Sequence, residues 1–347
     1  MTEQGMLFER VQQTEIYNRR YLGNKYRLLS FIDAVISKHC ENVNSLADIF
    51  AGTGVVASLY PSKILVTNDI LYSNYLCHVA WFSDEEFSEE KLSDLIAEYN
   101  KVVIGEDNYM SKTFAGTYFG MEACRQIGYI RADIQRRAYK GELNFREQAI
   151  LIAALMYGMD KIANTCGHYD AFRQGGDLYQ QLSLRLPHVF SSERNRGNRC
   201  FNEDANELVK RIRSDLVYID PPYNSRQYCD SYHVLENVAR WDKPSVSGVA
   251  RKMDRSSLKS AYCTLQAPKA FKDLIANIDA RYILVSYNNM AEKGDGRSNA
   301  KIADNEILDT LRERGNVEIF SQNYRSFTTG KSDHSDNTER LFLVTLS

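Results

Sequence analysis

Three things are scarce in this sequence: long apolar runs, paired cysteines and an excess of basic residues. No stretch approaches the roughly 18–20 apolar residues that cross a bilayer, and residues 1–20 lack the apolar centre of a signal peptide. We therefore expect a cytoplasmic protein with no membrane contact. The 7 cysteines stand singly, with no C-x-x-C pair, which argues against a disulfide framework and against a zinc site.

The charge balance argues against a purely electrostatic nucleic-acid binder. The formal net charge is −2, whereas proteins of that kind are basic. Any contact with nucleic acid must therefore come from local basic patches on a mixed surface. The chain has 347 residues, which suffices for one large domain or for about one and a half ordinary ones.

Short apolar runs alternate along the chain with segments of helical periodicity. Strands buried on both faces are expected at 45–50, 63–68, 215–219, 282–286 and 340–346. Helices are expected at 26–40, 90–103, 145–160, 232–240, 267–278 and 304–314. Strands that alternate with helices predict an open α/β sheet.

The interval between Asp69 and Asp215 interrupts this alternation. It consists mostly of predicted helix and loop, and it is too long to be a single connection. We expect it to hold the remaining sheet elements and an inserted, mainly helical domain. Its end, residues 184–213, is rich in loops and in arginine.

A glycine turn follows the first predicted strand, in the sequence ADIFAGTG at residues 47–54. Gly52 and Gly54 would let the backbone turn tightly and let a ligand approach the main chain. Valines replace the third glycine of a dinucleotide fingerprint, so a nucleoside ligand without a pyrophosphate fits better than NAD. Asp69, after the next strand, either holds ribose hydroxyls or caps a helix, and the sequence leaves both open.

The sequence LVYIDPPYN at residues 216–224 is the most informative stretch. Two prolines cannot continue a strand ladder, so they fix Asp220 and Tyr223 at the carboxyl edge of the sheet, where open α/β sheets bind ligands. The Asp220 carboxylate and the Pro221 carbonyl can accept both N–H groups of an exocyclic amine on an aromatic base. That draws the nitrogen toward a tetrahedral geometry with a free lone pair, while Tyr223 stacks on the base.

Four pieces of sequence together resemble the alpha-class N6-adenine DNA methyltransferases, the group of the Dam-type enzymes. They are, in chain order, residues 21–29 (YLGNKYRLL), 48–54 with Asp69, 202–205 (NEDA) and 220–223 (DPPY). Residues 224–228 and 232–236 are most similar to type IIS restriction-system methylases such as the FokI partner. The alpha class has this order of motifs, with a target-recognition domain as the insert.

The resemblance implies a Rossmann-like class I methyltransferase sheet that binds S-adenosyl-L-methionine. The catalytic domain would comprise residues 15–75 and 200–347, and residues 76–199 would form the inserted target-recognition region. Catalytic roles would fall to Asp220, Pro221 and Tyr223. Cofactor contacts would come from Tyr21, Leu22, Gly23, Lys25, Asp48, Phe50, Gly52, Thr53, Gly54, Asp69, Ile70, Asp204, Ala205 and Asp220.

The same resemblance implies a monomer that acts on double-stranded DNA in a prokaryotic cell, with a cognate restriction endonuclease as functional partner. The target adenine would have to leave the stack. We expect phosphate or loop contacts from Asn224, Arg226, Arg194, Arg196, Arg199, Arg251 and Lys252. Base-edge contacts are expected from Asn164, Thr165, His168, Arg173 and Gln174, although about half of these residues would be ordinary surface.

Three alternatives stay open from the sequence. Asp-Pro-Pro-Tyr also occurs in enzymes that methylate amines of structured RNA, although Asp220 rather than asparagine argues against the glutamine methylases. A non-catalytic DNA-binding homologue would need none of the motif residues that are intact here. Methylation of cytosine N4 is compatible with residues 220–223, and the aspartate at the first position favours adenine.

Overall fold

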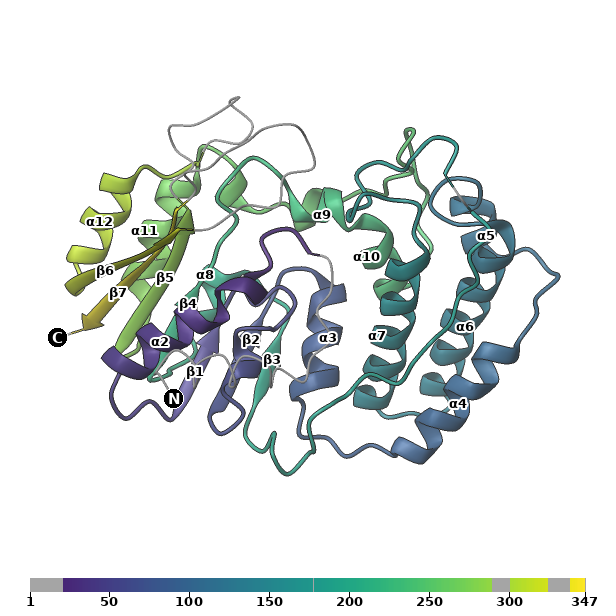
Figure 1. Ribbon diagram of the computed structural model, residues 1–347, viewed down its shortest axis with the longest axis horizontal. Coiled ribbons are helices and arrows are strands. Elements are labelled where there is room, and N and C mark those ends of the chain that lie inside the picture. The colour runs from purple at the N-terminus through teal and green to yellow at the C-terminus, as the bar shows by residue number, and fades with distance from the viewer. Residues whose placement is uncertain (1–20, 177, 289–299, 324–337, 347) are drawn as a thin grey trace.

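The computed structural model describes residues 21–176, 178–288, 300–323 and 338–346. Its centre is a sheet with the strand order β3-β2-β1-β4-β5-β7-β6 (Figure 1). The strands are β1 (Ser45–Asp48), β2 (Ile64–Asn68), β3 (Arg199–Phe201), β4 (Leu216–Ile219), β5 (Tyr282–Asn288), β6 (Gly315–Asn323) and β7 (Thr338–Leu346).

Strands β1 to β5 are parallel, and the strand order reverses between β1 and β4, as in doubly wound folds. Strand β7 is antiparallel and lies between β5 and β6. The prediction of a Rossmann-like methyltransferase sheet is confirmed. The reversal matters because it opens a crevice at the carboxyl ends of β1 and β4.

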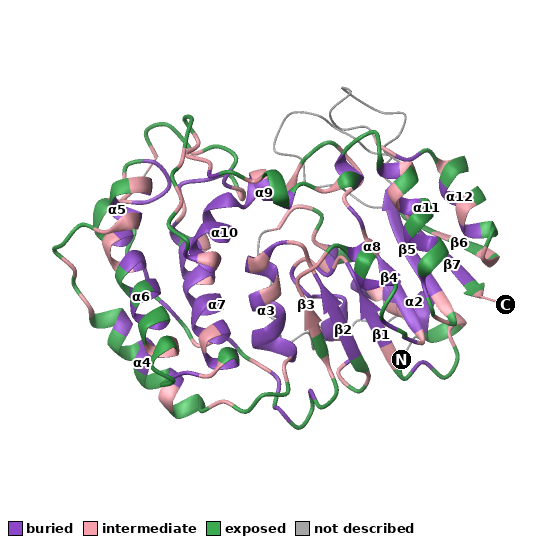
Figure 2. Ribbon diagram, turned by 180° about the vertical axis from the view of Figure 1, so that it is seen from behind, coloured by how far each residue is buried: buried purple, intermediate pink, exposed green. Residues whose placement is uncertain are grey.

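Successive residues of each central strand enter two separate cores. On β4, Leu216 and Tyr218 pack into the core beneath α2 (Leu29–His39), which follows a short 3-10 turn at Lys25–Leu28. Val217 and Ile219 enter the other core. That core is covered by α8 (Ala205–Leu208), α11 (Ala267–Asn277) and α12 (Asp304–Arg312). The central strands are therefore buried on both faces (Figure 2), which explains their continuous apolar sequence.

Beside the β3 edge of the sheet stands a group of helices (Figure 1). These are α4 (Glu89–Lys101), α5 (Tyr109–Phe114), α6 (Met121–Tyr139) and α7 (Phe145–Ile162). Helix α3 (Tyr72–Phe82) joins the two parts, because it packs against β2 and β3 on one side and against α7 on the other.

A second, separate stretch of chain completes this helical group. It contains α9 (Tyr228–Ser231) and α10 (His233–Arg240), and α10 packs against α3 and α7. Further along, the Tyr109 hydroxyl donates to the Pro244 carbonyl at 2.7 Å, and the Tyr118 hydroxyl donates to the Ala250 carbonyl at 2.9 Å. We call residues 84–198 together with 228–255 the helical half. Its second stretch lies inside the predicted catalytic segment 200–347.

The structure adds detail to the predicted elements. Strand β3 lies in the interval that was expected to hold the remaining sheet elements, whereas strand β6 was not expected. The helix predicted at 232–240 corresponds to α10, and the short helix α9, which was not predicted, ends just before Tyr232, whose φ and ψ are −123° and 20°. Residues 15–20 of the predicted catalytic segment lie outside the described residues. Over the part of the chain that is described, no helix combines the length and the apolar character that a membrane crossing needs.

Candidate active site

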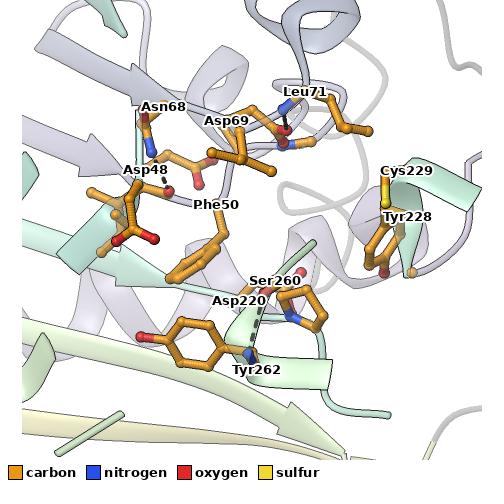
Figure 3. Close-up of a pocket in the computed structure, with 18 of the residues that line it drawn as sticks. Asp48, Phe50, Asn68, Asp69, Leu71, Asp220, Tyr228, Cys229, Ser260 and Tyr262 are labelled. Carbon is orange, nitrogen blue, oxygen red and sulfur yellow. Dashed lines mark hydrogen bonds between the residues drawn. The ribbon is translucent and has the colours of Figure 1, made fainter. Parts of the chain in front are cut away.

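A cavity of about 530 Å³ opens at the carboxyl edge of β1, β2 and β4. It brings together most of the predicted cofactor-binding residues. Its lining includes Tyr21, Leu22, Gly23, Lys25, Asp48, Phe50, Gly52, Thr53, Asp69, Ile70, Asp204, Ala205 and Asp220. Figure 3 shows how Asp48, Asp69 and Asp220 approach it from three different strand ends.

Both glycines of the turn adopt backbone conformations that other residues avoid. Gly52 has φ of +54° and Gly54 has φ of +79°. A Cβ atom on Gly54 would lie 3.0 Å from the Phe82 ring, so this residue packs behind the turn rather than lining the cavity. The His78 ring nitrogen lies 2.9 Å from the Gly52 carbonyl oxygen and supports the turn from below.

Asp69 holds the glycine turn and does not cap the next helix. One carboxylate oxygen accepts from the Gly52 amide at 3.0 Å, and the other accepts from the Leu71 amide at 2.8 Å. The first amides of α3, those of Tyr72 and Ser73, are instead capped by the buried Glu236 carboxylate at 3.0 and 2.9 Å. The position of Asp69 in the cavity wall therefore favours the interpretation that it binds ribose hydroxyls over the interpretation that it caps a helix.

Asp48 is the least compensated acidic group of the cavity. Neither of its carboxylate oxygens has a hydrogen-bond partner of normal geometry, and only the backbone groups of Phe50 and Ala57 lie close enough to favour its charge. Burial, followed by the charges of Asp220 and Asp69, raises the pKa of Asp48 well above its ordinary value. Burial also raises the pKa of Asp69 to about 7. Unpaired buried acceptors of this kind indicate a place for a cationic or hydrogen-bonding ligand.

The N-terminal motif is fastened to α9 and α10 by aromatic stacking. The Tyr21 ring stacks on Tyr232 at 4.4 Å and on Tyr228 at 5.4 Å between centroids. The Leu22 amide donates to the Tyr232 hydroxyl at 2.7 Å. Gly23 has φ of +72°, and a Cβ atom there would lie 2.7 Å from the Tyr228 hydroxyl oxygen. The motif therefore depends on glycine at this position for both conformation and space.

Asp220 follows the buried strand β4 directly and reaches the cavity. Its carboxylate lies 3.0 Å from the Lys25 ammonium, and burial raises its pKa to about 6 against the opposing effect of Lys25. Pro221 and Tyr223 continue past the cavity wall, and the Tyr223 ring meets Tyr287 edge-on at 6.2 Å. Asp220 and the glycine turn thus share one cavity.

One wall of the cavity could not be found from the sequence. It is formed by residues 256–263, which we call the strap and which line the cavity from Ser257 to Tyr262. The Tyr262 ring lies edge-on to Phe50 at 5.1 Å, and its hydroxyl donates to the Asn206 side chain at 2.8 Å. The strap is tied to the catalytic loop because Gln227 exchanges two hydrogen bonds with the Ser260 backbone, of 3.1 and 2.8 Å.

The predicted DNA contacts fall into three groups. Asn224 and Arg226 lie beside the catalytic loop, where the Arg226 amide donates to the Asn224 side chain at 2.9 Å and the arginine is exposed. Arg173 and Gln174 are exposed and His168 is partly buried, in a loop that packs against α9 and α10. Within this loop, the Tyr169 amide donates to the Ser231 carbonyl at 2.7 Å.

Two further residues of that loop, together with Arg251 and Lys252, are engaged in structural contacts. The Asn164 side chain is buried, and its amide donates to the Thr117 and Arg173 carbonyls at 3.1 and 2.8 Å. This placement argues against base readout by Asn164, and the neighbouring Thr165 is buried as well. Arg251 donates to the Thr113 carbonyl, and Lys252 pairs with Asp170.

The three remaining arginines lie at the opposite edge of the sheet. Arg199 begins β3 and pairs in register with Val66, whereas the carboxyl end of β3 is at Phe201. Arg194 and Arg196 precede that strand, and Arg194 stacks on the Phe190 ring at 4.2 Å. They are therefore at the amino edge of the sheet, away from Asp220. This position argues against a role for them in holding DNA at the cavity.

Comparison with known sequences agrees with this geometry. Residues 21–297 match the family of D12 class N6 adenine-specific DNA methyltransferases. The chain belongs to this family. The matched D12 range begins at the N-terminal motif and extends beyond the catalytic motif and the strap, so it includes the cavity-lining residues described above. The resemblance predicted from the sequence is confirmed.

Several known methylases are similar to nearly all of this chain. Modification methylase StsI of Streptococcus sanguinis is 34% identical over 94% of this chain and 51% of its own. Type II methyltransferase M.FokI of Planomicrobium okeanokoites is 30% identical over 93% of this chain and 51% of its own. M.NlaIII of Neisseria lactamica is 26% identical over 91% of this chain and 95% of its own. The chain thus spans about half the length of the first two relatives.

Proposed function

We propose that this protein transfers a methyl group from S-adenosyl-L-methionine to N6 of an adenine flipped out of duplex DNA, as the modification enzyme of a restriction-modification system. The observation that carries the proposal is that Asp220, at the end of β4, lines the same cavity as the glycine turn and Asp69. Membership of the D12 class and the names of the relatives support the reaction and the substrate.

The cavity fits the cofactor by charge and by shape. The unpartnered oxygens of Asp48 suit the ammonium group of the methionine moiety, and Asp69 suits the ribose hydroxyls. Phe50 and Tyr262 offer aromatic surfaces for the adenine ring. When bound, the cofactor supplies an electrophilic methyl group on a positively charged sulfur, which the acidic lining complements.

The residues of the catalytic motif would activate the target amine by position. The Asp220 carboxylate and the Pro221 carbonyl accept the two N–H groups of the amine, which frees its lone pair for in-line attack. Two prolines hold these acceptors rigid beyond β4, so little reorganisation accompanies the reaction. Tyr223, the residue after the two prolines, would stack on the extruded base.

The helical half is the candidate for target recognition. Its loop at 164–175 and the residues after α10 pack together beside α9, and α9 contributes Tyr228 to the cavity wall. A duplex that lay across this side would place its extruded base near Asp220, with Arg226, Arg173 and Gln174 exposed toward it. Since DNA is the substrate, the cytoplasm of a prokaryotic cell would be the site of action.

The test is to incubate the protein with duplex DNA and methyl-labelled cofactor and to identify the modified bases by sequencing and mass spectrometry. We expect N6-methyladenine within one short sequence. Asp220→Ala should lower the rate at least about 1,000-fold, in keeping with the loss of a preorganised acceptor, while calorimetry shows cofactor binding. Label confined to cytosine or to structured RNA would refute the proposed substrate, and a wild-type rate in Asp220→Ala would refute the mechanism.

A further inference from the structure

A buried ammonium group lies between two carboxylates at the catalytic motif. The Lys25 Nζ atom is 3.0 Å from an oxygen of Asp220 and 3.0 Å from an oxygen of Glu339. Lys25 is 6% exposed and Glu339 is 3% exposed. Glu339 belongs to the antiparallel strand β7, near the other end of the chain from Lys25, and it is not among the residues that line the cavity.

Neighbours on β5 fix the Glu339 carboxylate. The Ser286 hydroxyl donates to one carboxylate oxygen at 2.7 Å, and the Asn288 side-chain amide donates to the other at 3.4 Å. Asn288 is also the register partner of Glu339 across the two strands. Since both strands are regular and paired, the position of this carboxylate is set by the sheet rather than by a loop.

The arrangement affects how Asp220 can act. An ammonium paired with Asp220 alone would be free to shift with that side chain, and its full charge would compete with the target amine for the carboxylate. A second carboxylate at an equal distance divides the attraction and holds the lysine in place. The free oxygen of Asp220 then stays available to accept an N–H group.

We propose that Glu339 is a positioning residue, which holds the Lys25 ammonium against Asp220 and thereby sets the strength of Asp220 as a hydrogen-bond acceptor. This inference rests on the proposed role of Asp220 and assigns to β7 a part in the reaction.

The charges around Asp220 give the inference a distinctive signature. Lys25 lowers the pKa of Asp220, whereas Glu339 raises it. The other titratable groups that face this site are Asp48, Tyr218, Tyr223 and Tyr228. None of them is altered by a substitution at Glu339 or Lys25. Removal of the two charges in turn should therefore move the titration of Asp220 in opposite directions.

The experiment compares Glu339→Gln, Lys25→Met and the double variant with the wild type, with Glu318→Gln on the exposed part of β6 as the matched control. The titration of the Asp220 carboxyl is followed by ¹³C NMR, and the rate of methyl transfer is measured against pH. Glu339→Gln should lower the pKa of Asp220 and Lys25→Met should raise it. At a pH near the pKa of Asp220 in the wild type, the ratio of ionised to protonated Asp220 should change at least about threefold in each single variant.

The controls separate the inference from a purely structural role. Glu318→Gln should match the wild type, and the double variant should be more stable to urea than Lys25→Met, which leaves two buried carboxylates without a cation. A fall in rate in Glu339→Gln with an unmoved Asp220 titration would overturn the inference. The NMR titration decides it even if no DNA is methylated, an outcome that would refute the proposed function instead.

Discussion

The helical half and the cavity edge both bury charged side chains, but they treat them in opposite ways. In the helical half, the Arg146 guanidinium is fully buried and donates to the carbonyls of Ala80, Glu85 and Phe190 and to the Ser192 hydroxyl. Arg131 likewise donates to the Val238 and Ala239 carbonyls at 2.7 and 3.0 Å. These charges are satisfied by the protein itself.

At the cavity edge, the buried carboxylates are left with few partners. Asp48 is the clearest case, because its oxygens lack a hydrogen bond of normal geometry, whereas Asp69 accepts from two amides and Asp220 pairs with Lys25. Burial raises the pKa values of Asp48 and Asp69. A fully paired buried charge stabilises the packing of the elements around it, whereas a buried charge with few partners indicates a ligand site. The contrast separates buried charges that stabilise the fold from buried charges that line the cavity, and four experiments can break or sharpen it.

The largest effect on the free energy of unfolding is expected from Arg146→Met. Four contacts from Arg146 would be lost, to Ala80 in α3, to Glu85 and to Phe190 and Ser192 in the 190–192 loop, and buried carbonyls would be left without donors. We expect the free energy of unfolding to fall by about 3–5 kcal/mol, measured in urea at constant pH. Arg196→Met, which removes an exposed arginine, should change it by less than about 0.5 kcal/mol. Equal losses in the two variants would remove the contrast.

A smaller effect on the free energy of unfolding is expected when the pH is changed, because of the ionisation of Asp69. Because its pKa in the folded protein is about 7, above its value in the unfolded chain, the folded state binds more protons between these two values. Stability of the ligand-free protein should therefore fall as the pH rises from about 4 to about 7, by on the order of a few kcal/mol. Asp69→Asn should flatten this slope.

The same group gives a prediction for the ligand. A cofactor that needs the ionised Asp69 should raise the melting temperature more at pH 8 than at pH 5, and calorimetry should show weaker cofactor binding in Asp69→Asn by roughly tenfold. Stabilisation that is equal at both pH values, with unchanged affinity in the variant, would remove Asp69 from the cofactor site.

The smallest expected effect is on DNA binding, and it distinguishes the carboxyl edge of the sheet from the amino edge. Arg226→Ala should weaken binding to duplex DNA by up to about tenfold and reduce the slope of log affinity against log salt by about 1. Arg194→Ala, at the amino edge, should leave both unchanged. Fluorescence anisotropy at several salt concentrations measures the two quantities. Equal losses would mean that DNA reaches around to the β3 edge.

Local sequence predicted the central fold better than its edges. The strands β1, β2, β4 and β5 were predicted because burial on both faces makes them continuously apolar. Strand β6 was missed because it lies at the edge of the sheet, where exposed polar residues alternate with apolar ones. The short helix α9 was also missed, and its neighbour Tyr232 accepts a hydrogen bond from the Leu22 amide, far away in the sequence.

The residues of the candidate site also differ in how well the sequence predicts them. Residues in contiguous motifs, such as Asp220 and Gly52, could be found because their chemistry is local to a strand end. Tyr262 and Glu339 could not, because each acts through a partner brought close only by folding: Phe50 in one case and Lys25 in the other. Asn164 looked like a base reader from its residue type, and only its burial identifies it as a loop support.

The helical half is assembled from two separate stretches of chain, and this has a practical consequence for changing specificity. A graft of residues 76–199 from a relative would leave behind α10, whose Val238 and Ala239 carbonyls accept hydrogen bonds from Arg131 of the insert. The incoming cassette would meet a foreign surface along its whole inner side. Hybrid proteins should therefore exchange residues 228–255 together with the insert, so that each helical half keeps its own inner wall.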